Sequence, residues 1–129
     1  MRYYEIEEAM EKLKIMNYRG IFMRDQLNDL KPLENECGIL NLNSSKDLGS
    51  HWTAWYKKKD DIYYFCSYGS SPPIELEKYF KVNQNDIKRH KFCIQDLFDE
   101  HCCGEMAIQF LILMDRDWEY KEAVLFLVR

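Results

Sequence analysis

Apolar side chains recur every three or four positions at the start of the chain and again near its end. The first stripe consists of Ile6, Ala9, Met10, Leu13 and Met16. This spacing predicts an amphipathic helix, which Asn17 to Gly20 would end, since glycine suits the turn beyond a helix. A second stripe consists of Ala107, Phe110, Leu111 and Met114. It predicts a buried helix after Gly104, and a last helix is expected over residues 120–128.

Strand-like segments fill the middle of the chain. The candidates are residues 20–23 (strand or loop), 38–42, 51–57, 62–66 and 89–94. A charged turn at 58–61 predicts that the strands on either side of it form a hairpin. Pro73 predicts a helix over residues 74–80, because proline is favoured just inside the start of a helix. The pattern is therefore α+β, with strands in the middle and helices at both ends.

The composition fits one domain with a hydrophobic core. The chain has 129 residues, of which 47% are hydrophobic and 31% are charged, as is ordinary for a soluble globular protein. The net charge of −4 argues against nucleic acid as a partner, because a polyanion is repelled at long range. The dense basic run at residues 57–59 is followed by two aspartates, and it fits a solvated turn.

Other features predict an intracellular protein. No segment is long or apolar enough to span a bilayer, and the first residues lack the apolar core of a signal peptide. Five cysteines are an odd number for a secreted disulfide framework. Reduced thiols in the cytoplasm or nucleus are therefore expected.

Groups with catalytic chemistry follow one another in a fixed order. His51 comes first, the run 63–69 contains Cys66, Gln95 follows, and Cys103 opens the second apolar stripe. This order supplies a candidate base, a place for an orienting residue, an amide donor and a thiol nucleophile. Papain-type enzymes have the cysteine first and the histidine later. The order here indicates a different thiol-protease architecture.

The chain resembles the adenain-like cysteine proteases, a group that includes the adenovirus endopeptidase and related enzymes of viruses and virus-like transposons. This group is a cousin of the ubiquitin-like-protein-specific proteases. The matching segments are residues 19–25, 35–42, 49–52, 63–69, and 103–104 leading into 109–111. The resemblance implies one adenain-like domain over residues 1–129, with a papain-like-superfamily core whose central mixed or antiparallel sheet is flanked by helices.

The resemblance also implies an activity and residue roles. The activity is a cysteine endopeptidase that cleaves peptide or isopeptide bonds. No cofactor is expected, and whether a peptide completes the site stays open. Its substrate would be a polypeptide such as a viral precursor or a ubiquitin-like protein. His51 would be the base or imidazolium partner, Cys103 the nucleophile and Gln95 the oxyanion donor, with Trp52 packed nearby. A helix N-terminus and a nearby imidazolium both favour the thiolate form of a cysteine, and an oxyanion donor can be worth about 3–4 kcal/mol.

The third triad position departs from the family pattern. Cys66 stands where the family usually has Asp, sometimes Glu or Asn. A neutral thiol is a weak acceptor, and loss of the analogous aspartate in a serine protease lowers turnover about 10⁴-fold. Asp60, Asp61 or a water would have to substitute for it. Slow catalysis and lost catalysis therefore both stay open.

The spacing of the oxyanion donor also departs from the family. Gln95 lies eight positions before Cys103, whereas the family spacing is nearer six or seven. Cys102 fits that spacing better, but the family cysteine directly precedes glycine, as Cys103 does. Cys103 is favoured, and Cys102 stays a competitor.

Other interpretations compete with the enzyme. Cys93, His101 and the two adjacent cysteines suggest zinc, but there is no CxxC pair, so no metal is expected. His90 is expected in a basic surface segment without a role. A second hypothesis is a degenerate protease that still binds a peptide or a ubiquitin-like tail. A third is a scaffold protein in which the thiols are simply small buried apolar residues.

Overall fold

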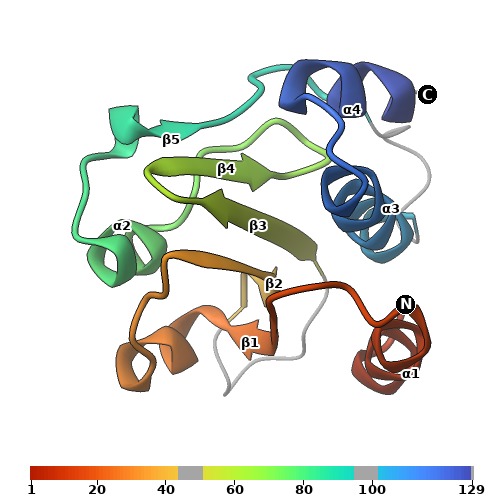
Figure 1. The fold of residues 1–129 in the computed structure, drawn as a ribbon, viewed down its shortest axis with the longest axis horizontal. Helices are drawn as coiled ribbons and strands as arrows, with labels where there is room; N and C mark the ends of the chain where they lie inside the picture. Colours follow the sequence, from red (N-terminus) through yellow and green to blue (C-terminus); the bar gives the residue numbers. More distant parts are fainter. Residues whose placement is uncertain (44–50, 95–101, 129) are drawn as a thin grey trace.

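The computed structural model describes residues 1–43, 51–94 and 102–128 of the chain. Figure 1 shows its elements, which in chain order are α1 (Tyr3–Leu13), β1 (Tyr18–Met23), η1 (Arg24–Asp29), β2 (Asn35–Asn41), β3 (Trp52–Lys58), β4 (Asp61–Phe65), α2 (Ile74–Phe80), η2 (Gln84–Asp86), β5 (Ile87–Lys88), α3 (Cys103–Asp115) and α4 (Tyr120–Leu127). The fold is α+β, as the apolar pattern predicts.

The strands form one mixed sheet of five strands in the order β1-β2-β3-β4-β5. The two outer pairs, β1 with β2 and β4 with β5, are parallel. The three central strands pair antiparallel. The expected hairpin is confirmed: Lys58 pairs with Asp61, and Lys59 in the turn has a left-handed backbone with φ 56°.

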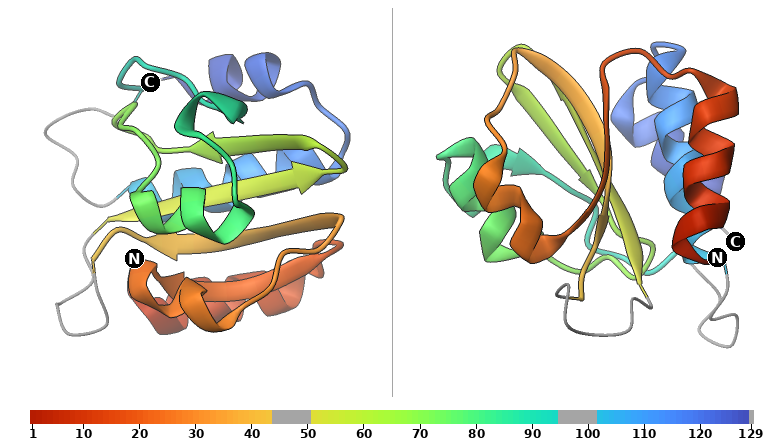
Figure 2. Two further views of the ribbon diagram at one scale, coloured as in Figure 1. Left: turned by 90° about the vertical axis from the view of Figure 1, so that its left-hand side faces the viewer. Right: turned by 90° about the horizontal axis from the view of Figure 1, so that it is seen from below.

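Helices cover both faces of the sheet, as the right-hand view in Figure 2 shows. On one face, α1, α3 and α4 pack on inward-facing strand residues such as Ile39, Ala54 and Phe65. On the other face, η1 and α2 pack on Leu40 and Tyr64. Residues 39 and 40 face opposite ways because side chains alternate along a strand.

A glycine lets a large aromatic ring pack on the central strands. Gly38 of β2 pairs with Trp55 of β3, and the indole lies over the glycine, where an added Cβ would lie 2.6 Å from Trp55 Cζ2. Trp55 is fully buried. Only glycine leaves room for this ring, so the position is fixed by packing.

The first helix ends earlier than its stripe predicts. Lys14 takes a left-handed conformation with φ 50° and stops α1, so Met16 lies beyond the helix and is 71% exposed. Gly20, expected in the turn after the helix, lies inside β1 with φ +130°. The β1–β2 register shifts between Tyr18 and Ile21, as expected where a glycine adopts such a conformation.

The prediction of a strand at residues 89–94 is wrong. In this region β5 covers only Ile87 and Lys88. Beyond it the backbone bonds to other partners: the N–H of His90 donates to the hydroxyl of Tyr120 at 2.9 Å, and the N–H of Ile94 donates to the Ser67 carbonyl at 2.9 Å. The N–H groups of His90 and Ile94 therefore bond to these partners and not to a neighbouring strand.

Candidate functional site

His51 and Cys66 meet at one end of the β3–β4 hairpin. His51 directly precedes β3 and Cys66 directly follows β4, and antiparallel pairing brings these two positions together. The Nε2 atom of His51 lies 3.2 Å from the Cys66 Sγ atom. The residue at the expected third position therefore contacts the expected base.

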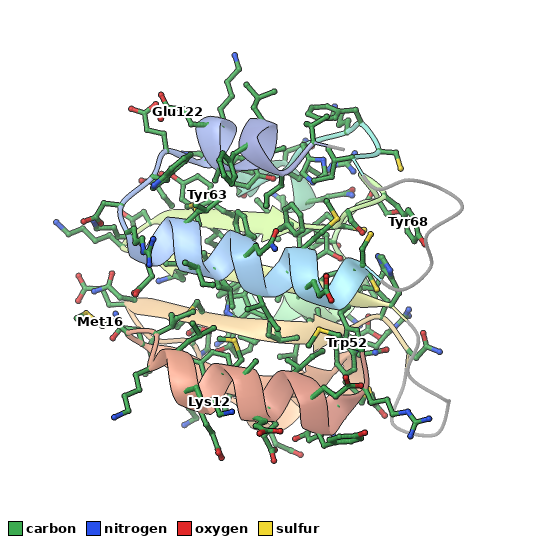
Figure 3. All side chains as sticks on the ribbon, turned by 90° about the vertical axis from the view of Figure 1, so that its right-hand side faces the viewer. Lys12, Met16, Trp52, Tyr63, Tyr68 and Glu122 are labelled. Atoms are coloured by element: carbon green, nitrogen blue, oxygen red, sulfur yellow. The ribbon has the colours of Figure 1, made fainter. Side chains whose placement is uncertain are left out.

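A tyrosine covers the imidazole. The rings of His51 and Tyr68 stack with centroids 4.5 Å apart and an interplanar angle of 17°. Figure 3 shows Tyr68 and Trp52 at the end of the molecule where α3 begins. Tyr68 lies within the matched run 63–69, but the sequence alone gives no signal for this stacking.

Burial keeps both partners uncharged at neutral pH. It lowers the pKa of His51 to about 4, because a desolvated imidazolium is disfavoured. Burial also raises the pKa of the Cys66 thiol, although backbone N–H groups of residues 68–70 partly oppose this. The pair is thus a neutral imidazole beside a neutral thiol.

The carboxylates of the hairpin turn lie at the wrong end to replace the missing aspartate. Asp61 begins β4 and Cys66 follows its last residue, and strand residues rise about 3.3 Å each. The Asp61 carboxylate is held instead by Lys88 Nζ at 2.8 Å. Asp60 lies in the same turn. Neither side chain is placed to orient His51.

Cys103 is the first residue of α3, as the apolar stripe predicts. Gly104, which follows Cys103, lets this end of the helix approach β3. A Cβ atom on Gly104 would lie 3.3 Å from Trp52 Cδ1 and 3.1 Å from Met1 Cβ. Trp52 is the residue after His51, and its indole N–H donates to the Met1 carbonyl at 2.9 Å. The first turn of α3 and the start of β3 therefore pack directly against each other.

The two adjacent thiols have different surroundings. Cys102 precedes the helix, and its Sγ atom lies 3.7 Å from the Met106 Sδ atom within the core. A nucleophile at this position would have to leave that contact. Cys103 is 2% exposed and Cys102 is 7% exposed, so neither thiol is open to solvent. The preference for Cys103 stays a prediction.

Two expected contributors, Gln95 and His101, lie outside the described residues. Ile94, just before Gln95, is bonded to Ser67, which follows Cys66. Cys93 is exposed, unlike the other cysteines of the described ranges. Within those ranges no three metal-ligating side chains come together.

The expectation that His90 lies at the surface is wrong. It is 7% exposed, with its Nδ1 atom 2.9 Å from the Phe92 carbonyl oxygen and its ring 5.4 Å from that of Phe65. Burial is also the main cause of its lowered pKa. Flanking charges suggest a surface segment, but His90 turns inward.

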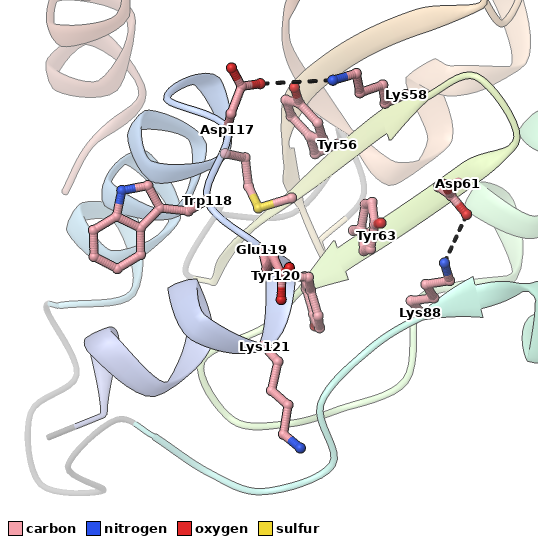
Figure 4. A pocket seen from close by; sticks show the side chains of 11 residues that line it. Tyr56, Lys58, Asp61, Tyr63, Lys88, Asp117, Trp118, Glu119, Tyr120 and Lys121 are labelled. Atoms are coloured by element: carbon pink, nitrogen blue, oxygen red, sulfur yellow. Dashed lines mark hydrogen bonds and ion pairs between the residues drawn. The ribbon is translucent and has the colours of Figure 1, made fainter.

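A separate hollow lies at the far end of the hairpin (Figure 4). It has a volume of about 600 Å³, and residues at its wall include Tyr63, Asp117, Trp118 and Tyr120. The helix α3 runs from Cys103 to Asp115, so it places its first residue and this hollow at opposite ends. Of the expected site residues that the structure describes, His51, Cys66 and Cys103 do not line the hollow.

In the part of the chain that the structure describes, no helix is long and apolar enough to cross a membrane. Compared with known protein families, the chain matches none. A search of curated proteins also finds no match.

Proposed function

We propose that this protein is a cysteine endopeptidase with an adenain-type core, acting on peptide or isopeptide bonds. The observation that carries the proposal is the 3.2 Å contact between His51 Nε2 and Cys66 Sγ. It joins two residues that the family resemblance assigns to one triad. The packing of Gly104 on Trp52 adds support, because it brings the helix turn of Cys103 beside the residue next to His51.

The proposed reaction uses the chain's own groups. His51 accepts the Cys103 thiol proton as the sulfur attacks the scissile carbonyl carbon, and the Gln95 amide donates to the oxyanion. The tetrahedral intermediate collapses, the C–N bond breaks, and His51 returns the proton to the leaving amine. Water, activated by His51, then cleaves the thioester, which releases the acid product and restores the thiol.

The neutral His51–Cys66 pair predicts a slow enzyme. A base with a pKa of about 4 takes a proton from a thiol only at a large free-energy cost. An aspartate in place of Cys66 would stabilise the imidazolium, and a neutral thiol does not. Weak turnover is therefore expected from the original chain.

The test is the pH dependence of alkylation at Cys103. Iodoacetamide labelling between pH 5 and pH 9, read by peptide mass mapping, would be compared in the original chain and in His51→Ala. If His51 accepts the Cys103 proton as the sulfur attacks, alkylation of Cys103 at pH 7 should be about 10-fold or more slower in His51→Ala than in the original chain. The exposed thiol of Cys93 serves as an internal reference for the labelling conditions.

Cys102→Ser gives the matched control, since it removes the neighbouring thiol and leaves the proposed nucleophile. The labelling rate of Cys103 in Cys102→Ser should equal that in the original chain. If instead the labelling rate of Cys103 is the same with and without His51, the catalytic proposal fails.

The second candidate function is a degenerate protease that binds a peptide or a ubiquitin-like tail. The observation that favours it is the absence of charge on the His51–Cys66 pair, whose members have a lowered and a raised pKa. Such a module would show no Cys103 acylation, and restoring a carboxylate at position 66 would not change that.

A further inference from the structure

A basic groove lies beside β5, away from the His51–Cys66 pair. It has a volume of about 480 Å³, and its polar lining includes Ser71, Gln84, Asn85, Lys88, Arg89 and Lys91. No carboxylate of the described residues lines it. Three cations therefore converge on one hollow in a chain whose net charge is −4.

Two of the three cations, Arg89 and Lys88, are held by their neighbours. Arg89 Nη1 donates to the Gly69 carbonyl at 3.2 Å. Lys88 Nζ donates to Asp61 at 2.8 Å, a contact drawn in Figure 4. These bonds use one N–H group of each side chain, whereas a guanidinium has five N–H groups and an ammonium has three.

The backbone that carries the groove is packed against its neighbours. An added Cβ on Gly69, which has φ +74°, would lie 2.6 Å from the Phe92 carbonyl oxygen. The turn after Cys66 thus packs tightly on the segment after β5. The His90 N–H to Tyr120 hydroxyl bond fixes the same segment to α4. A backbone that is already ordered loses less entropy on binding.

We propose that this groove binds the phosphate group of a phosphomonoester. A guanidinium, ammonium groups, a hydroxyl and side-chain amides are the donors that tetrahedral oxyanions accept. The volume exceeds that of one phosphate, which fits a phosphate carried on a larger molecule. The net charge of −4 opposes a long polyanion, whereas a compact dianion experiences mainly the local field, because salt screens charges beyond about 8 Å.

The hollow shown in Figure 4, which adjoins the groove, is not suited to an anion. It meets the groove at Lys88 and Tyr120, but its lining also includes Asp61, Asp117 and Glu119. Those carboxylates repel anions. The phosphate site is therefore confined to the basic groove, and it does not depend on the peptidase proposal.

The test is an NMR titration of the ¹⁵N-labelled chain with O-phosphoserine at pH 7 and constant ionic strength. Saturable shifts are expected at residues 69–71 and 84–91, with a dissociation constant in the millimolar range or below. Arg89→Gln and Lys91→Gln should each weaken binding about 10-fold. The Arg89→Gln variant loses the bond to Gly69, which could disturb the turn. Lys91 is exposed, so Lys91→Gln is expected to fold and tests the groove independently.

Lys12→Gln is the matched control, since Lys12 is exposed on α1 and forms an ion pair with Glu8 on the same helix. It should leave binding unchanged. A parallel titration with inorganic phosphate tests which part of the ligand is recognised. If it binds as tightly as O-phosphoserine, the groove recognises the phosphate group alone. If it binds more weakly, the groove also recognises the rest of the ester.

Three results would overturn the proposal. They are shifts that do not saturate, equal weakening by Lys12→Gln, and tighter binding of a short oligonucleotide or a glutamate-rich peptide than of O-phosphoserine.

Discussion

A single sulfur atom decides the chemistry of the candidate centre. Cys66 is 1% exposed and lies 3.2 Å from His51 Nε2, where a carboxylate would form an ion pair. We predict that Cys66→Asp raises the pKa of His51 from about 4 to above 6.5, since an adjacent carboxylate favours the imidazolium. Peptide hydrolysis should rise about 10-fold or more. Histidine NMR titration and hydrolysis of a peptide substrate measure the two effects.

Cys66→Ser is the control for this variant, because a serine has nearly the size of the thiol and stays neutral. It should leave both the titration and the rate near those of the original chain. A raised His51 pKa without any gain in hydrolysis would favour the binding module over the peptidase.

At the scale of elements, one buried carboxylate joins four parts of the fold. Glu36 in β2 is 1% exposed. Its oxygens accept bonds from Trp55 Nε1 at 3.0 Å, from the Tyr79 hydroxyl at 2.7 Å, from Arg19 Nη1 at 3.3 Å and from the Leu33 N–H. These donors come from β3, α2, β1 and the segment before β2. The carboxylate therefore fixes how these elements sit together.

We predict that Glu36→Gln lowers the free energy of unfolding by about 2–4 kcal/mol. The amide nitrogen of glutamine would face donors that need an acceptor, and Arg19 would lose its counter-charge. Urea denaturation at pH 7 measures the change.

Glu34→Gln serves as the control for this prediction, because Glu34 is exposed and such surface changes stay within about 0.5 kcal/mol. Equal effects of the two substitutions would contradict the role given to Glu36.

The elements were largely predictable from the sequence, since their signals are local. The spacing of apolar residues predicts α3, and Pro73 with the apolar positions after it predicts the bounds of α2. The segment 89–94 was not predictable as irregular, because its backbone partners, the Tyr120 hydroxyl and the Ser67 carbonyl, come from distant parts of the chain.

The family resemblance predicts the His51–Cys66 pair. The Tyr68 stacking and the inward turn of His90 depend on tertiary packing, which leaves no local pattern.

For the whole molecule, two histidines with a lowered pKa, His51 and His90, predict a loss of stability in mild acid. In the unfolded chain a histidine titrates near pH 6.5, whereas folding lowers the pKa of His51 to about 4 and also lowers that of His90. Between these pH values the unfolded state binds more protons. The stabilisation is therefore complete above pH 6.5 and declines as the pH falls toward 4. His51, which is partly exposed, should contribute about 1–3 kcal/mol.

Urea denaturation at pH 7.5 and pH 4.5, in the original chain and in His51→Gln, isolates this contribution from the titration of carboxylates. The variant should lose less stability between the two pH values, because glutamine takes up no proton. A His51 pKa that is raised on folding, and not lowered, would reverse this result. If His51 were already an imidazolium at neutral pH, paired with a Cys103 thiolate, its folded pKa would lie above 6.5 and its stabilisation would persist in mild acid. A larger loss in His51→Gln than in the original chain would thus overturn the neutral pair and indicate a preformed thiolate–imidazolium centre.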